Sequence, residues 1–253
     1  MVEALFWPAL LAYGEAAVAY ASPRTARAAT WGVRLGWLAQ SALLAVQAAR
    51  ADGFPWSSWA GSLNLFVWLV VSAYLIWGCR PRFRLLGLAV MPLAVVLFVV
   101  ARLGGGTHGG SGAAYGSAFL VLHVGLVLAA FAGFTLAAAL AGVYLWQERR
   151  LKSRAPDILR LRLPPLQSLE RLTWRTVLVS LPLLTLGLLV GVLRLRRDHA
   201  GIDALEAATL VTWLVYGGFV ALRPTGRRAA YLALGGFALV VLARLVLSAG
   251  HFT

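Results

Sequence analysis

Charged residues are scarce in this sequence. They make up 13% of its 253 residues, where a soluble domain carries about a quarter. The shortage falls mostly on acidic residues, of which there are nine against 23 lysines and arginines. Hydrophobic residues account for 60% of the chain, and the mean hydropathy is +0.79. This composition argues against a soluble domain and is typical of a polytopic all-α membrane protein.

Cysteine is almost absent as well. Cys79 is the single one, so neither an internal disulfide nor a thiolate metal cluster is expected. It ends an apolar run, where we expect an inert packing role. The net charge of +14 does not indicate a nucleic-acid partner, because the arginines cluster in short links between apolar runs.

Apolar runs dominate what remains. A helix needs about 20 mostly apolar residues to span a ~30 Å hydrocarbon core. Eight runs approach this length, at residues 4–21, 31–49, 59–78, 84–102, 116–146, 173–193, 205–222 and 229–249. We expect the first to be a retained helix and not a secretory signal, because it lacks a basic start and contains Glu3 and Glu15. The sequence therefore predicts a single domain of eight transmembrane helices over residues 1–253.

The arginines and lysines in the links predict an orientation. One alternating set of links holds 16 of the 23 basic residues and the other set holds five. Because basic residues concentrate on the cytoplasmic side, both termini are predicted outside, and the basic link at 147–172 is predicted inside. This link has two candidate roles, contact with anionic lipid headgroups or with a cytoplasmic partner. We expect a multi-pass protein of the inner (plasma) membrane of a bacterium.

The predicted orientation places all four histidines toward the outer side. His123 lies about six residues into the fifth run, or ~9 Å along a helix, and His251 lies just past the eighth. Two neutral imidazoles at similar depth can bind a haem iron from opposite faces. The alternative is a helix-packing seam, because Gly116, His123, Ala130 and Ala137 share one face at a spacing of seven.

Charged residues inside apolar runs need partners. Arg244 is seven residues before His251, so both share a face if the last helix continues. A haem propionate would suit its forked donors, and Asp203 or Glu206 is the alternative partner. Arg34 in the second run and Glu15 in the first are expected to form a buried ion pair. Trp56, Trp59 and Trp68 are interpreted as an interfacial belt, or as flanks of a flat aromatic ligand.

Three segments carry a resemblance to a known family. They read "VLHVGLVLAAFAGFTLAAALAGVYLWQERRLK", "RLPPLQSLERLTWRTVLVSLPLLTLGLLVG" and "TLVTWLVYGGFVALRPTGRRAAYLALGGFALVVL". With the earlier stretch "GFPWSSWAGSLNLFVWLVVSAYL", they resemble the cytochrome c assembly family of CcsA and HemX-type proteins. The resemblance covers nearly the whole chain and is closer in size to the HemX type.

The resemblance implies haem handling, with haem b as the cofactor. Members with the full pattern carry two outer histidines that ligate haem, a tryptophan-rich outer loop between them, and further histidines within the membrane. His123 is similar to the first outer histidine, and His251 is similarly placed to the second. Arg244 and Arg102 would then pair with the haem propionates.

This sequence departs from the family pattern in ways that leave only the outer haem site to be expected. The stretch at 194–213 has no tryptophan before Trp213, so the loop that presents haem to apocytochrome is missing. The helix-2 histidine of the family falls near Gln40, and the helix-7 histidine falls on Ala221. A second, inner haem position would therefore lack both ligands.

No catalytic residue is predicted, and haem binding, transfer or regulation is favoured over catalysis. The leading hypothesis is a membrane protein that binds or passes haem through His123 and His251. The second is a membrane regulator of haem biosynthesis, which the resemblance links to the level of glutamyl-tRNA reductase; other cytochrome c assembly components are alternative partners. The third is an unrelated small-molecule transporter, although no convincing internal repeat supports it.

Overall fold

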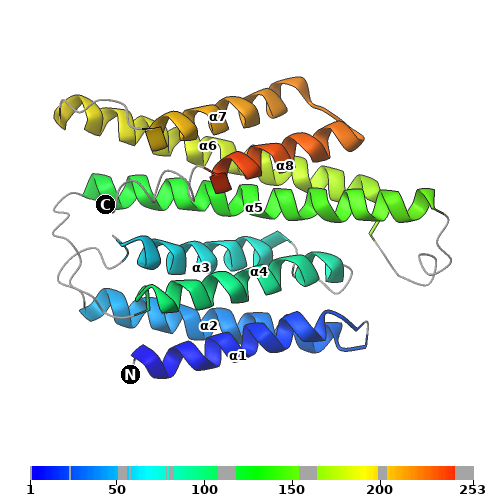
Figure 1. The fold of residues 1–253 in the computed structure, drawn as a ribbon, viewed down its shortest axis with the longest axis horizontal. Coiled ribbons are helices and arrows are strands. Elements are labelled where there is room, and N and C mark those ends of the chain that lie inside the picture. Colours follow the sequence, from blue (N-terminus) through cyan, green and yellow to red (C-terminus); the bar gives the residue numbers. More distant parts are fainter. Residues whose placement is uncertain are drawn as a thin grey trace. The chain divides into compact units, whose positions relative to one another are not determined.

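The computed structural model describes residues 2–22, 24–50, 56, 58–77, 79, 83–107, 118–153, 164–198 and 204–242. This part of the chain forms eight α-helices and no strand (Figure 1). They are α1 (Val2–Ala19), α2 (Ala26–Arg50), α3 (Trp59–Trp77), α4 (Arg84–Leu103), α5 (Ala118–Lys152), α6 (Leu166–Asp198), α7 (Ala204–Leu222) and α8 (Gly226–Leu242). The predicted all-α fold with eight helices is confirmed.

α6 is much longer than the apolar run predicted, and α5 continues past its predicted end. α5 has 35 residues and α6 has 33, which at ~1.5 Å per residue makes each about 50 Å long. The apolar pattern placed the end of one helix at 146 and the start of the next at 173. Both helices continue through polar residues, so the basic link at 147–172 is helical at both of its ends, and residues 154–163 lie outside the described part.

Among the described residues, four helices are long and apolar enough to cross a membrane. They are α3, α4 and the segments Val121–Lys152 of α5 and Leu166–Leu193 of α6. Two shorter apolar helices accompany them, Ala4–Ala19 and Glu206–Leu222. The protein is therefore a multi-pass membrane protein. Eight spans and the outward termini stay predictions.

The chain divides into two compact units, Met1–Ser117 and Ala118–Thr253. In the first unit, α1 packs against α2 and α4, and α3 packs against the same two helices. Its core is aromatic, with Tyr13, Tyr20, Tyr74 and Phe98 fully buried. Close approach depends on small residues, because a Cβ atom at Gly36 would lie 2.6 Å from the Tyr13 ring.

The helices of the second unit pack in the same pattern as those of the first. α5 packs against α6 and α8, and α7 packs against the same two helices. The rings of Phe134 and Tyr216 stack in its core at a centroid distance of 3.7 Å and an interplanar angle of 3°. The Tyr216 hydroxyl donates to the carbonyl of Ala233 at 3.0 Å, which joins α7 to α8. These contacts hold α5, the helix that carries His123, against its neighbours.

Candidate functional site

His123 lies in the second turn of α5, half-buried beside α6. Its Nδ1 atom is 2.7 Å from the carbonyl oxygen of Gly187. A carbonyl oxygen only accepts hydrogen bonds, so Nδ1 carries the proton and donates it. In the neutral ring the lone pair is then on Nε2, the nitrogen that remains available to a metal.

Two glycines on α6 make this contact possible. A Cβ atom at Gly191 would lie 2.8 Å from His123 Cε1, and one at Gly187 would lie 2.8 Å from Val127 Cγ2. Both distances are too short for real side chains, so the imidazole and the α5 backbone lie directly against the bare backbone of α6. The helix-packing alternative for His123 holds for the contact itself, because the histidine joins α5 to α6 by a hydrogen bond.

The other predicted ligand is not described. His251 and Arg244 both lie outside the described residues, so the pairing of His123 with His251 stays a prediction. The acidic alternative for Arg244 is half outside as well, because Asp203 is not described and Glu206 lies in the first turn of α7.

Arg102 belongs to the first unit, in the last turn of α4. Its Cζ atom lies 5.6 Å from the centroid of the Phe6 ring, a distance at which a guanidinium is attracted to an aromatic face. Its predicted role toward a propionate stays a prediction.

The predicted ion pair between Glu15 and Arg34 is wrong. Both side chains are exposed, and no ion pair joins them in the described part of α1 and α2. Arg34 instead places its Cζ atom 4.9 Å from the centroid of the Trp31 ring. The two residues point away from the α1–α2 contact, where Tyr13 and Gly36 meet.

Gln40, near which the family's helix-2 histidine falls, is fully buried in a polar network. Its Oε1 accepts from the Tyr13 hydroxyl at 2.8 Å, and its Nε2 donates to Asn64 Oδ1 at 3.0 Å. Asn64 donates to Gln47 at 3.2 Å, and Gln47 donates to the carbonyl of Gly106 at 3.0 Å. The network joins α1, α2, α3 and the turn after α4, and it occupies both ends of the Gln40 amide.

Neither position that would serve an inner haem carries a metal ligand. The Gln40 amide is committed to its neighbours, and Ala221 is an exposed alanine near the end of α7. Gln47 and Asn64 were not predicted as members of a site. A signal existed, because amide side chains inside apolar runs must find hydrogen-bond partners.

Trp68, which is predicted to lie in an interfacial belt, packs against α2. Its ring stacks on Trp37 at 5.7 Å and 18°, and its indole N–H donates to Ser41 Oγ at 2.8 Å. Trp37 in turn donates to Ser72 Oγ at 2.7 Å. Trp68 is thus tied to α2, while Trp59 at the start of α3 is 43% exposed.

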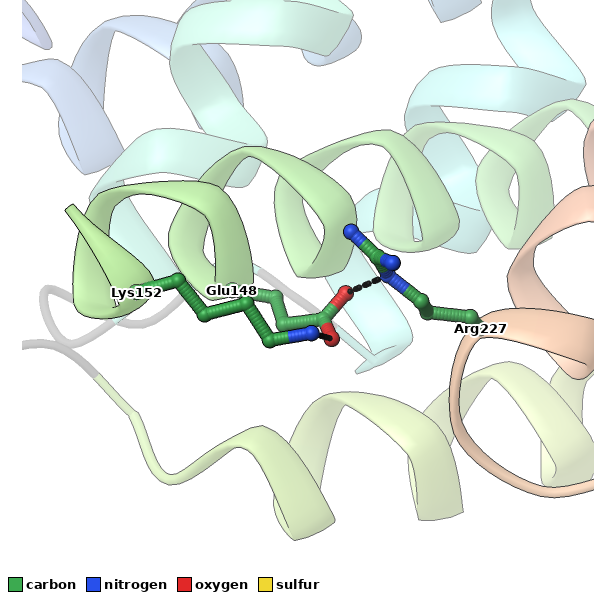
Figure 2. A network of polar contacts seen from close by, with 3 residues as sticks. All are labelled: Glu148, Lys152 and Arg227. Atoms are coloured by element: carbon green, nitrogen blue, oxygen red, sulfur yellow. Dashed lines mark hydrogen bonds and ion pairs between the residues drawn. The ribbon is translucent and has the colours of Figure 1, made fainter.

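Basic side chains gather where α5 ends and α6 and α8 begin. We call this surface the basic end, and its exposed members are Arg149, Arg150, Lys152, Arg171, Arg175, Arg223, Arg227 and Arg228. Figure 2 shows Glu148 held between two of them, with Lys152 Nζ and Arg227 Nε each 2.8 Å from its carboxylate. Glu170 accepts from the backbone N–H of Gly226 at 2.9 Å. Both carboxylates that the structure describes at this surface are therefore engaged within the protein.

Comparison with known proteins places these features in a family. The family model described as "Cytochrome C assembly protein" matches residues 56–251. The chain belongs to the cytochrome c assembly protein family. The match includes His123, Arg102 and His251, whereas Gln40 precedes it.

Several curated relatives are similar over most of their length. "Cytochrome c biogenesis protein CcsA" of Gloeothece citriformis is 26% identical over 266 residues, covering 83% of this chain and 81% of the relative. The protein of the same name from Guillardia theta is 26% identical over 213 residues, or 74% and 71% of the two chains. "Protein HemX" of Brevibacillus brevis is 28% identical over 160 residues, or 62% and 58%. The predicted membership of the CcsA/HemX group is confirmed.

Proposed function

We propose that this protein binds haem b and passes it on during cytochrome c assembly, with His123 as an axial ligand of the iron. The observation that carries the proposal is the hydrogen bond from His123 Nδ1 to the carbonyl of Gly187, at 2.7 Å. Histidines that bind metals almost always donate their second ring N–H to a carbonyl or carboxylate, which fixes the free nitrogen. His123 has this arrangement, and axial histidine is a common haem ligand.

The remaining parts of the site are assigned by the same proposal. His251 supplies the second axial imidazole, and Arg244 and Arg102 pair with the two propionates, since a guanidinium matches a carboxylate. The site faces the outer side of a bacterial plasma membrane, as the count of basic residues in the links predicts. Haem would supply the iron and the flat ring; the protein would supply the ligands and the charge partners.

The proposal is binding and transfer without catalysis. The tryptophan-rich loop of the family is absent from 194–213, and the position of an inner ligand holds Gln40 in a closed network. One outer haem site is therefore the role that fits this chain, in cooperation with other cytochrome c assembly components.

The experiment uses two substitutions of one residue. Asn places its amide nitrogen near the position of His Nδ1, so His123→Asn retains a donor for Gly187 and removes the ligand; His123→Ala removes both. The full-length protein is purified in detergent and titrated with haem b while the Soret band is recorded. We expect both variants to lose axial ligation by His123 and only His123→Ala to lose thermal stability. Undiminished binding with an unchanged Soret band in His123→Asn would overturn the ligand assignment.

His251 needs its own variant. We expect His251→Ala to convert a six-coordinate spectrum into a five-coordinate one without removing haem altogether, because His123 still binds. An unchanged spectrum means that another group occupies the second axial position.

A second candidate function follows from the basic end. Because Glu148 and Glu170 are engaged internally, the arginines there present a net positive surface to a partner. In this alternative the protein regulates haem biosynthesis by docking glutamyl-tRNA reductase. The test is co-purification with Arg149→Glu plus Arg171→Glu, and the control is Arg24→Glu plus Arg27→Glu in the first unit. Equal recovery of the enzyme by both double variants would exclude the basic end as the docking surface.

A further inference from the structure

We propose that Gly187 and Gly191 are positioning residues that decide which nitrogen of His123 faces the iron. The inference rests on the proposed function and deepens it. It states that α6 holds the proton of the imidazole on Nδ1 before haem arrives, so that Nε2 is already free to ligate. The histidine is the ligand; the two glycines act through it.

The first step is access to the Gly187 carbonyl. A carbonyl oxygen has two lone pairs, so it can accept a side-chain hydrogen bond in addition to the one within its helix. Access requires α5 to lie close. A Cβ atom at Gly187 would be 3.4 Å from the backbone nitrogen of Val127 and 3.5 Å from Leu126 Cβ, besides its clash with the Val127 side chain. Glycine is therefore needed for the approach of the two helices at this level.

The second step is the orientation of the ring. A Cβ atom at Gly191 would lie 2.8 Å from His123 Cε1, 3.2 Å from Nδ1 and 3.8 Å from Nε2. The edge that carries Cε1 and Nδ1 thus rests on the backbone of Gly191, and Nε2 lies farther from it. A ring turned over would place a carbon opposite the Gly187 oxygen, and the hydrogen bond would be lost.

The third step is the register between the helices. Ten residues beyond His123, Gly133 of α5 has the Ser180 hydroxyl directly against it, at the place where a Cβ atom would be. Gly133 with Ser180 and His123 with Gly187 are thus two close contacts along one antiparallel pair. A slide of one helix along the other would disturb both, so the carbonyl partner of His123 is fixed by the packing of α5 on α6.

The chemical consequence concerns the proton. A ring nitrogen must be unprotonated to bind a metal. Because Nδ1 already holds the proton of the neutral ring, Nε2 binds iron without a tautomer change. Second-shell hydrogen bonds of this kind typically affect metal affinity by about 10–100-fold, which sets the effect expected when the contact is broken.

The tautomer is measured first, without haem. Full-length protein with ¹⁵N-labelled histidine gives ring-nitrogen resonances by NMR in detergent, and His123→Asn identifies those of His123 by their loss. We expect the parent protein to show a protonated Nδ1 and an unprotonated Nε2. The opposite tautomer in the parent would overturn the inference. The tautomer itself is read from the parent protein, so it does not depend on a variant in which the contact between α5 and α6 is disturbed.

Matched glycine variants provide the second measurement. Gly191→Ala places a methyl group against the ring, whereas Gly125→Ala, two residues from His123 on α5, has no atom within 4 Å of the added carbon. We expect Gly191→Ala to lose the Nδ1–H signature and to bind haem about 10–100-fold more weakly, while Gly125→Ala matches the parent in both. An altered tautomer with unchanged haem affinity would overturn the positioning role.

The two readouts separate the two proposals. If the parent shows the expected tautomer and binds no haem, the proposed function fails while the assignment of the proton stands. If the parent binds haem through His123 and its free form carries the proton on Nε2, the function stands and the positioning role of the glycines fails.

Discussion

Trp37 and Trp68 each donate their indole N–H to the serine one helical turn beyond the other tryptophan. Trp37 bonds Ser72, Trp68 bonds Ser41, and the two rings stack at 5.7 Å between them. The arrangement is reciprocal, so α2 and α3 are joined by one stacked pair and two hydrogen bonds of the same kind. A shift of one helix against the other would break both bonds together.

This reciprocity predicts coupled effects in a double-mutant cycle. Ser41→Ala and Ser72→Ala should each lower the free energy of unfolding by about 1 kcal/mol, the net value of a typical hydrogen bond. The second substitution should cost less than the first, because the stack has already loosened. Denaturant titration in detergent of the single and double variants measures the coupling. Strict additivity would show that the two bonds act independently.

Removal of the Gln40 amide should destabilise the first unit. Gln40→Leu keeps the approximate volume and removes the partner of the Tyr13 hydroxyl and of Asn64 Oδ1. A buried polar group that loses its hydrogen bond costs about 1–3 kcal/mol, and we expect a fall in that range.

Thermal unfolding followed by circular dichroism measures this loss. The control is Leu38→Ala, a substitution on the same helix at a side chain that is 57% exposed. If Gln40→Leu melts at the same temperature as Leu38→Ala, the network contributes no stability.

Two adjacent glycines on α8 should respond differently to the same change. A Cβ atom at Gly236 would lie 2.8 Å from the Tyr216 ring, whereas the space around Gly235 is open to 4 Å. Gly235→Ala should be neutral or stabilising by up to about 1 kcal/mol through helix propensity. Gly236→Ala should cost about 1–3 kcal/mol, since overpacking displaces a fully buried ring. Equal melting temperatures for the two variants would contradict the packing of α7 on α8.

The ion pairs at the basic end should be salt-dependent. Glu148→Gln removes the carboxylate that Lys152 and Arg227 share, and both cations are well exposed, at 61% and 47%. We expect a small loss of thermal stability at low ionic strength that disappears in high salt, because exposed pairs are screened. A loss that is independent of salt would indicate a packing role for the Glu148 side chain.

Much of the fold followed from the sequence because apolar runs in a membrane protein must become helices. The run predicted at 84–102 is the helix Arg84–Leu103 almost to the residue. The ends of α5 and α6 were missed because polarity marks where a helix leaves an apolar environment, and helical hydrogen bonding can continue beyond that point.

The error over Glu15 and Arg34 was avoidable. The buried residues of α1 and the turn after it recur at Phe6, Ala9, Tyr13, Ala16 and Tyr20, a helical stripe that excludes residue 15. Glu15 and Arg34 lie at similar depth along their helices, which suggested an ion pair. Their side chains are on the exposed faces of α1 and α2 and not on the faces by which the two helices pack.

The hydrogen-bond partner of His123 could not be predicted from the sequence. A backbone carbonyl carries no residue-specific signal, and the spacing of Gly187 and Gly191 reveals a close helix contact without naming what lies in it. The histidine was found as a polar residue in an apolar run. Its proton position required the structure of the α5–α6 pair.

The length of α5 and α6 has a consequence for recognition at the basic end. Helices of about 50 Å exceed a ~30 Å hydrocarbon core, and their surplus turns carry Arg149, Arg150, Lys152 and Arg171 of that surface. A partner that docks there meets these four side chains on preformed helix and not on a loop that must first become ordered. The entropy lost on association is correspondingly smaller, so a modest contact area would suffice for a specific complex.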